Sequence, residues 1–175
     1  LYLNLGGGHF KKADGALPYE TASGSRVIAA DYDGDGDQDL FVGGRAAPFE
    51  YGAPARALLL RNDGRGRFDD VAPTLAPTLA RAGMITDAVW RDVDGDRRPD
   101  LVAVGDWMPV TVFRNAGGGR LERQAVRGLE RSAGWYTRIV PVDLGDGGGP
   151  HFVVANFGHN GRFQATPAAP VELFV

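Results

Sequence analysis

Short apolar runs separated by glycine, aspartate and asparagine fill most of the chain, and no long stretch has helical periodicity. Runs such as VIAA, LFVGG and LVAVG are short and rich in β-branched residues, which is typical of strands joined by turns. The pattern therefore predicts an all-β fold with four strands in each complete unit. The predicted strands are 1–5, 9–13, 26–31, 39–43, 57–61, 67–71, 85–92, 100–105, 110–114, 120–124, 136–143, 151–157 and 171–175.

The stretch ADYDGDGDQDLFVGG, from Ala30 to Gly44, places an aspartate at every odd position from 1 to 9 of a loop between two predicted strands. These carboxylates repel one another unless a cation neutralises them, and a metal-free turn would gain nothing from their charges. Ca²⁺ accepts roughly six to eight oxygen ligands in flexible geometry. An EF-hand would need a glutamate at position 12, which is Val42, and two flanking helices. We therefore predict a calcium site formed by Asp31, Asp33, Asp35, Asp37 and Asp39.

The same loop recurs as DVDGDRRPD, and we predict a second calcium site there, formed by Asp92, Asp94, Asp96, Arg98 and Asp100. Arg97 replaces the glycine of position 6, which reduces the freedom of the turn. A third copy begins at Asp143, but Gly145, Gly147 and His151 stand where the other carboxylates should be, and Asp146 alone cannot rebuild the site. A glycine-rich hairpin without metal is the favoured interpretation of that third copy.

A second motif accompanies the first: LYLNLGGGHF, LLLRNDGRGRF and VTVFRNAGGGRL align on Asn4, Asn62 and Asn115. Each is an apolar run followed by a glycine-rich turn and then an aromatic residue or leucine, as in a hairpin. Self-similarity at a period of roughly 50 to 60 residues indicates a repeat architecture. The proline-rich stretch APTLAPTLARAG is interpreted as a connection between repeats that includes one helical turn.

These motifs resemble the FG-GAP and VCBS repeats, a family that includes the integrin α-chain propeller and many bacterial surface proteins. The resemblance implies that each repeat is one four-stranded antiparallel blade of a β-propeller, with calcium bound between its first two strands. Residues 1–175 then form one propeller segment: a partial blade 1–20, blades 21–80 and 81–132, and a partial blade 133–175. We expect the remaining blades to come from a longer parent chain or from a self-associated copy.

The composition of the chain bears on its partners and its location. Of the 22 acidic residues, nine lie in the two intact calcium loops, so the rest of the chain has more basic than acidic residues. These arginines form no basic run, which argues against nucleic-acid binding. There is no cysteine for a disulfide, and no apolar run of about eighteen residues that would span a membrane. Because such loops need more calcium than the cytosol offers, we expect a secreted, periplasmic or cell-surface location.

A ligand is expected at the end opposite the calcium loops, where long loops connect the strands. Tyr51, Trp107, Trp135 and Arg162 are the candidate ligand-binding residues, although the tryptophans could instead pack between blades. No cysteine nucleophile, G-x-S-x-G or H-E-x-x-H motif occurs, and the three histidines are isolated. We therefore expect a non-enzymatic scaffold that binds a protein or glycan. The alternative is the wall of a carbohydrate-active enzyme, similar to a polysaccharide lyase, whose catalytic residues lie largely outside this segment.

Overall fold

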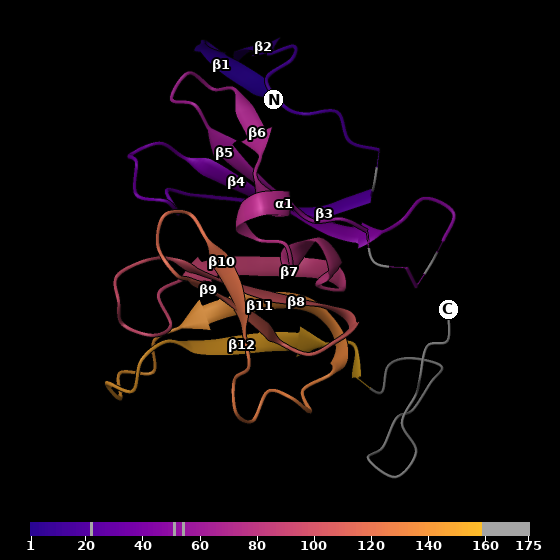
Figure 1. The fold of residues 1–175 in the computed structure, drawn as a ribbon, viewed down its shortest axis with the longest axis vertical. Helices are drawn as coiled ribbons and strands as arrows, with labels where there is room; N and C mark the ends of the chain where they lie inside the picture. The colour runs from indigo at the N-terminus through magenta and orange to yellow at the C-terminus, as the bar shows by residue number, and fades with distance from the viewer. Residues whose placement is uncertain (22, 51, 54, 159–175) are drawn as a thin grey trace.

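The computed structural model describes residues 1–21, 23–50, 52–53 and 55–158, and these form antiparallel β-sheets stacked along the long axis of the molecule (Figure 1). The first sheet has the order β3-β4-β5-β6. The second has the order β7-β8-β9-β10, and the β11–β12 pair is joined to it because the start of β11 pairs with the end of β8, so that six strands are connected. A hairpin, β1–β2, lies at one end of the stack, and the β11–β12 pair lies at the other.

The strands have the following bounds. They are β1 Tyr2–Gly6, β2 His9–Lys12, β3 Ser23–Ala30, β4 Asp39–Ala46, β5 Leu58–Asn62, β6 Phe68–Asp70, β7 Met84–Arg91, β8 Asp100–Met108, β9 Thr111–Asn115, β10 Leu121–Gln124, β11 Gly134–Val142 and β12 His151–Asn156. Each lies where a strand was predicted, which confirms the all-β fold with antiparallel sheets. The predicted strand 171–175 lies outside the described residues.

Strands β4 and β8 run three residues further than predicted, because the glycines that ended the apolar signal lie inside them. A Cβ atom on Gly44 would lie 2.5 Å from the carbonyl oxygen of Ala55, and one on Gly105 would lie 2.0 Å from that of Met84. These glycines therefore allow close backbone approach within the sheets, and they do not end the strands.

The connection between the first and second sheets contains one α-helical turn, α1 (Ala72–Leu75), as predicted, and a second turn of 3₁₀-helix, η1 (Leu79–Arg81). Ala72, Ala76 and Leu79 are fully buried in this segment. They join Phe41 and Phe113 in the core cluster between the two sheets. The connection is therefore part of the hydrophobic core.

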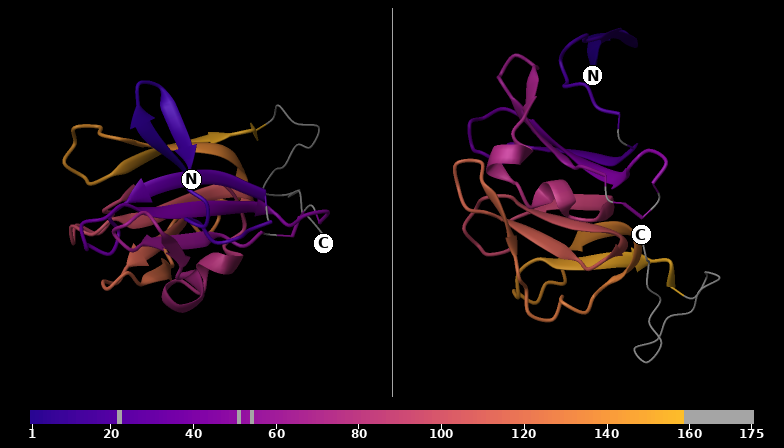
Figure 2. Two further views of the ribbon diagram at one scale, coloured as in Figure 1. Left: turned by 90° about the horizontal axis from the view of Figure 1, so that it is seen from above. Right: turned by 45° about the vertical axis from the view of Figure 1, so that its right-hand side comes forward.

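The first strands of successive sheets lie side by side (Figure 2), and an equivalent hydrogen bond joins each neighbouring pair of them. The hydroxyl of Ser25 on β3 donates to the carbonyl oxygen of Ile85 on β7 (2.5 Å). Thr86, the equivalent residue of β7, donates to the carbonyl oxygen of Tyr136 on β11 (2.6 Å). One repeated contact thus sets the spacing of consecutive sheets.

A buried carboxylate links the same three strands. Asp87 on β7 pairs with Arg26 on β3 at 2.9 Å and with Arg138 on β11 at 3.8 Å. It also accepts a hydrogen bond from the main-chain N–H of Ile139 (3.0 Å). The three charged residues occupy the same position of their repeats, five residues before the first aspartate of each loop. The alternation of charge therefore makes the contacts between neighbouring sheets specific.

We predict that Asp87→Ala lowers the free energy of unfolding by about 2–3 kcal/mol, because it leaves the main-chain N–H of Ile139 without its acceptor and two arginines without their ion-pair partner. Chemical denaturation monitored by circular dichroism would measure the change. The matched control is Asp69→Ala on β6, an exposed aspartate, for which a change within about 0.5 kcal/mol is expected. Equal effects of the two substitutions would contradict the bridging role of Asp87.

Candidate metal centres

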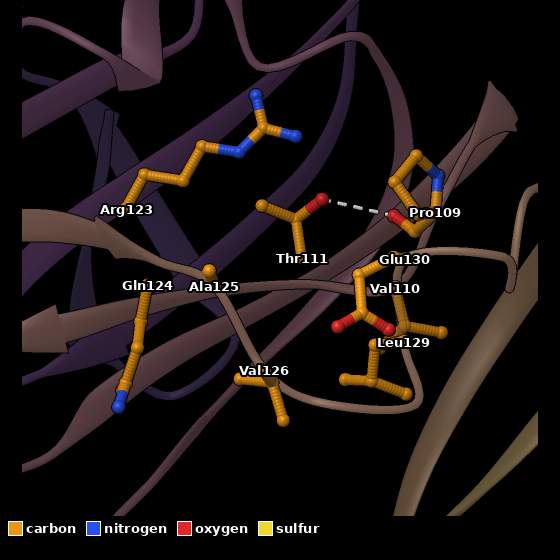
Figure 3. Close-up of a pocket in the computed structure, with 9 residues that line it drawn as sticks. All are labelled: Pro109, Val110, Thr111, Arg123, Gln124, Ala125, Val126, Leu129 and Glu130. Carbon is orange, nitrogen blue, oxygen red and sulfur yellow. Dashed lines mark hydrogen bonds between the residues drawn. The ribbon is translucent and has the colours of Figure 1, made fainter.

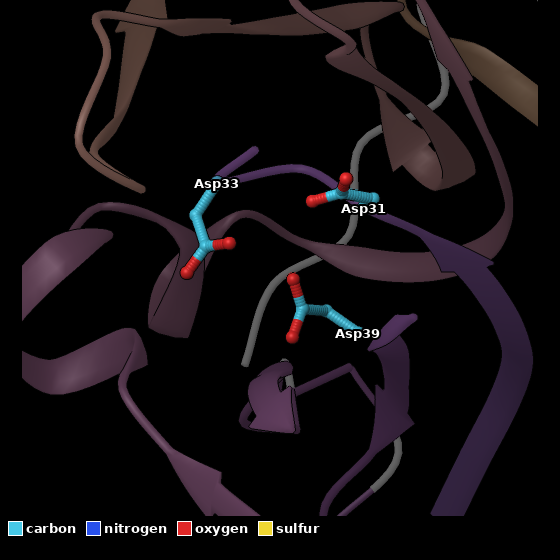
Figure 4. A group of neighbouring side chains, drawn as sticks. All are labelled: Asp31, Asp33 and Asp39. Atoms are coloured by element: carbon cyan, nitrogen blue, oxygen red, sulfur yellow. The ribbon is translucent and has the colours of Figure 1, made fainter. Parts of the chain in front are cut away.

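The loop between β3 and β4 brings three of its carboxylates together. Asp31, Asp33 and Asp39 each offer an oxygen, and these oxygens lie within 4.8 Å of one another. Figure 4 shows the three side chains directed toward a common space. The turn is held by Asp31, which accepts hydrogen bonds from the main-chain N–H groups of Gly34 (2.8 Å) and Gly36 (3.1 Å). Both glycines have positive φ, which is why the aspartate spacing can close into a loop.

Asp39 is the buried member of this group, with 1% of its surface exposed. Its Oδ1 accepts a hydrogen bond from the main-chain N–H of Asn62 (2.8 Å), while its Oδ2 has no hydrogen-bond partner among the described residues. Burial raises the pKa of Asp39 to about 6, and burial also raises that of Asp33, with the charge of Asp35 adding to the effect. A buried, unpaired carboxylate oxygen facing two other carboxylates is an arrangement that a cation would stabilise.

The loop between β7 and β8 has the same geometry. Asp92, Asp94 and Asp100 offer oxygens that lie within 4.8 Å of one another. Asp92 accepts hydrogen bonds from the N–H groups of Gly95 (2.7 Å) and Arg97 (2.8 Å), as Asp31 does in the first loop. Arg97 has a φ of 68°, so the left-handed conformation of Gly36 is kept although a side chain is present, at a cost of roughly 1–2 kcal/mol.

Arginines distinguish the second loop from the first. Arg114 on β9 forms an ion pair with Asp94 and lies 3.5 Å from Asp96, which also pairs with Arg98. The hydrogen bond from Arg114 lowers the pKa of Asp94. Both oxygens of the buried Asp100 accept main-chain hydrogen bonds, from Asn115 (2.7 Å) and Val93 (2.9 Å). The carboxylates of the second loop thus have more partners within the protein than those of the first.

The other predicted ligands lie outside these two groups. The Oδ1 atoms of Asp35 and Asp96 accept hydrogen bonds from the main-chain N–H groups of the residues at position 7, Asp37 and Arg98 (2.9 Å each). The carboxylate of Asp37 lies beside the β5–β6 turn, since a Cβ atom on Gly64 would be 2.7 Å from its Oδ2. Metal ligation by these four residues stays a prediction.

Two asparagines that the sequence assigned only to hairpins also hold the acidic loops. The side chain of Asn62 donates to the carbonyl oxygen of Gln38 (3.1 Å), and that of Asn115 donates to the carbonyl oxygen of Pro99 (3.2 Å). Their main-chain N–H groups bond the aspartates of position 9, as described above. The recurrence of asparagine at aligned positions was the available signal, but sequence alone did not show what its side chain contacts.

The first loop also contacts the neighbouring sheet. Asn115 donates a second side-chain hydrogen bond to the carbonyl oxygen of Tyr32, at position 2 of the first loop (2.6 Å). Tyr32 is 1% exposed and stacks on Trp90 of β7, with ring centroids 5.6 Å apart. A Cβ atom on Gly119 in the β9–β10 turn would lie 3.2 Å from the Cβ of Asp33. The first acidic loop therefore lies at the junction of the two sheets.

The third loop has a different arrangement. Asp146 pairs with Nε2 of His151 at 2.9 Å, and this hydrogen bond lowers the pKa of Asp146. The oxygen of Asp143 accepts from the main-chain N–H of Gly145 (2.8 Å). The absence of metal from this loop stays a prediction.

At the opposite end, Trp107 and Trp135 stack on each other with centroids 5.5 Å apart, and Trp135 also packs on Phe157 (4.9 Å). Packing between strands thus accounts for the placement of both candidate tryptophans. Their role in ligand binding stays a prediction, and Tyr51 and Arg162 lie outside the described residues.

A pocket of about 390 Å³ lies near the β8–β9 and β10–β11 connections (Figure 3). It is lined by Pro109, Val110, Thr111, Arg123, Gln124, Ala125, Val126, Leu129 and Glu130. Figure 3 shows Arg123 on one side of it and Glu130 on the other. The tryptophan pair does not line this pocket, so the two features are separate.

We predict that calcium stabilises the protein more at pH 7 than at pH 5. A carboxyl whose pKa is raised on folding, from 3.8 to about 6 for Asp39, favours the folded state at low pH. This contribution disappears as the pH rises through 6. Asp39 alone should therefore lower the free energy of unfolding of the metal-free protein by about 2 kcal/mol between pH 4 and pH 7. Calcium binds the deprotonated carboxylates and offsets the loss. Thermal unfolding with calcium or EDTA measures both effects, and an equal calcium effect at the two pH values would contradict the prediction.

Comparison with known families was consistent with this geometry. A family model described as an FG-GAP-like repeat matches residues 1–42 and 92–154, which include all six aspartates of the two carboxylate groups. No curated protein matches the chain. Among the described residues, no helix is long and apolar enough to cross a membrane. Because the matched segments cover more than half of the sequence, the chain belongs to the FG-GAP-like repeat family.

Proposed function

We propose that this chain is a calcium-binding segment of a β-propeller, in which the first and second sheets are complete blades and the calcium ions hold neighbouring elements together. The observation that supports it most is the pair of aspartate groups, each bonded to an asparagine in the turn of its own sheet. Two acidic loops with the same geometry, in a chain of FG-GAP-like repeats, favour a repeated structural ion.

Calcium would be held in the first loop by Asp31, Asp33 and Asp39 and in the second by Asp92, Asp94 and Asp100. The ion supplies positive charge where these carboxylates converge. Because Asp39 and Gln38 are bonded to Asn62, ordering the first loop also orders the β5–β6 hairpin. Because Tyr32 is bonded to Asn115, ordering that loop also holds the second sheet against the first.

We also propose that the segment is a non-catalytic scaffold of an exported protein and binds a protein or glycan at the end opposite the acidic loops. Loops on a rigid scaffold commonly bind ligands, and the acidic side chains at the other end are turned toward one another. The exposed Phe49 lies in the β4–β5 connection, beside the predicted ligand-binding residue Tyr51 in the sequence. The need of such loops for abundant calcium supports an extracellular or periplasmic location.

Calcium is expected to raise the melting temperature by about 5–10 °C at a hundredfold excess over Kd, which corresponds to about 2.7 kcal/mol. The variant Asp39→Asn should lose the part of this stabilisation that comes from the first site. Its amide oxygen can still accept the hydrogen bond from the main-chain N–H of Asn62, but the negative charge is gone. Without calcium, this variant should be at least as stable as the wild type at pH 7, since the buried charge is gone. Asp69→Asn is the control and should keep the full calcium response. If both variants respond as the wild type does, the first site is wrongly assigned.

For ligand binding, we expect Tyr51→Ala combined with Trp107→Ala to abolish binding to a glycan array or protein partner while calcium affinity changes little. Asp33→Ala should weaken calcium binding and stability first. A melting temperature measured for each variant separates loss of contact from loss of fold. A partner whose affinity depends on Asp37 or Gln38 and not on the long loops would contradict this division. Turnover of a polysaccharide by the longer parent protein would contradict the non-catalytic role.

A further inference from the structure

The two acidic loops share their aspartate spacing but not their charge. Residues 31–39 contain five aspartates and no basic residue, which gives a formal charge of −5, whereas residues 92–100 contain four aspartates and two arginines, which gives −2. Positions 6 and 7 carry the difference, with a glycine and an aspartate in the first loop and Arg97 and Arg98 in the second. Because the affinity of an oxygen-ligand site for Ca²⁺ depends on the number of charged ligands, this difference favours tighter binding in the first loop.

An arginine on the third strand of each complete sheet adds to this difference. Arg61 on β5 and Arg114 on β9 occupy equivalent positions, directly before the asparagine that ends each strand. Arg114 forms an ion pair with Asp94 and lies 3.5 Å from Asp96. In the part of the chain that the structure describes, Arg61 forms no ion pair with a carboxylate of the first loop. The equivalent arginines therefore neutralise the second loop but not the first.

Arg98, at position 7 of the second loop, is fixed by two contacts. Its guanidinium pairs with Asp96, and its Nε donates a hydrogen bond to the carbonyl oxygen of Asn115 (3.0 Å). At the same position of the first loop, Asp37 adds a negative charge. The second loop is therefore partly neutralised by side chains that its own sheet holds in place.

The buried aspartates at position 9 differ in the same direction. In the first loop, Oδ2 of Asp39 is buried and has no hydrogen-bond partner among the described residues. The side chain of Asp39 is directed toward Asp31 and Asp33 (Figure 4). In the second loop, both oxygens of Asp100 accept main-chain hydrogen bonds. A buried oxygen without a partner gains more from a cation than one already bonded to N–H groups, so this comparison also favours the first loop.

We propose that the two loops are unequal calcium sites, and that Arg114 lowers the affinity of the second by occupying Asp94. The first loop fills first, whereas the second fills only at calcium concentrations that displace Arg114. This inference rests on the proposed function, because it requires that both loops bind calcium. The guanidinium groups neutralise the second loop when no ion is bound, so that loop responds to a higher range of calcium than the first.

Arg114 accounts for part of the difference in affinity. Its side chain is 43% exposed and that of Asp94 is 25% exposed, and an ion pair of this kind changes an equilibrium constant by up to about fivefold. Arg98 and the missing aspartate of position 7 add to this effect. The dissociation constants of the two sites should therefore differ by at least about tenfold.

Isothermal titration calorimetry of the full chain with calcium tests the order of filling. The wild type should bind two ions in two steps, and Asp39→Asn should lose the tighter step. Asp94→Asn should lose the weaker step and keep the turn, since its amide oxygen can still accept the hydrogen bond from the main-chain N–H of Asp96 (3.2 Å). Equal affinities, or loss of the tighter step in Asp94→Asn, would overturn the inference and leave the proposed function standing. The absence of any calcium binding would overturn both.

Two matched variants test the role of Arg114. At about 0.15 M salt, which screens distant charges, Arg114→Gln should raise the affinity of the weaker site by about fivefold and leave the tighter site within about twofold. Arg61→Gln removes the same charge from the equivalent position of the first sheet, and it should leave both affinities within about twofold. An unchanged weaker site in Arg114→Gln would overturn the role of this arginine. So would a gain in the tighter site of Arg61→Gln as large as that expected for Arg114→Gln.

Discussion

The aspartate at the ninth position of each acidic loop is the point at which the sheet, the hairpin and the candidate ion meet. Asp39 and Asp100 are the first residues of β4 and β8, so the direction of their side chains is set by the strand. Each accepts the main-chain N–H of the asparagine that ends the third strand. A buried carboxylate with such partners cannot move without disturbing two strand pairings. The same group therefore orders the fold and lies where a cation could be held.

Features that depend on neighbouring residues in the sequence could be predicted, whereas contacts between distant repeats could not. Strands and acidic loops depend on local patterns, and the sequence was sufficient to place them. The pairing of Asp87 with Arg26 and Arg138 joins three repeats, and it became visible only when their equivalent positions were packed together. The role of Asn115 in holding Tyr32 is likewise a contact between sheets. Gly105 was predicted to end its strand. The structure shows that a glycine is needed there because the backbone of Met84 comes very close, and a local sequence pattern does not reveal such a contact.

The two acidic loops differ in how the repulsion among their aspartates is reduced. Burial raises the pKa of the ninth-position aspartate in both loops, Asp39 and Asp100. In the first loop, Asp39 keeps an oxygen without a hydrogen-bond partner among the described residues. In the second, Arg114 and Arg98 neutralise Asp94 and Asp96, and main-chain N–H groups satisfy both oxygens of Asp100. Arginines in the second loop therefore occupy carboxylates that a metal ion would also bind. The charge of the first loop is less neutralised within the protein, although both loops have the same aspartate spacing.

This difference has a structural consequence because the first loop makes the larger contact with the neighbouring strands. Tyr32 follows Asp31 directly, and it packs on Trp90 while its carbonyl oxygen accepts from Asn115. In the second loop the equivalent residue is Val93, which packs toward the β11–β12 pair with a smaller side chain. Disorder of the first loop would thus loosen the larger of the two inter-sheet contacts. The loop whose buried carboxylate keeps an unpartnered oxygen among the described residues is also the loop that joins the first two sheets.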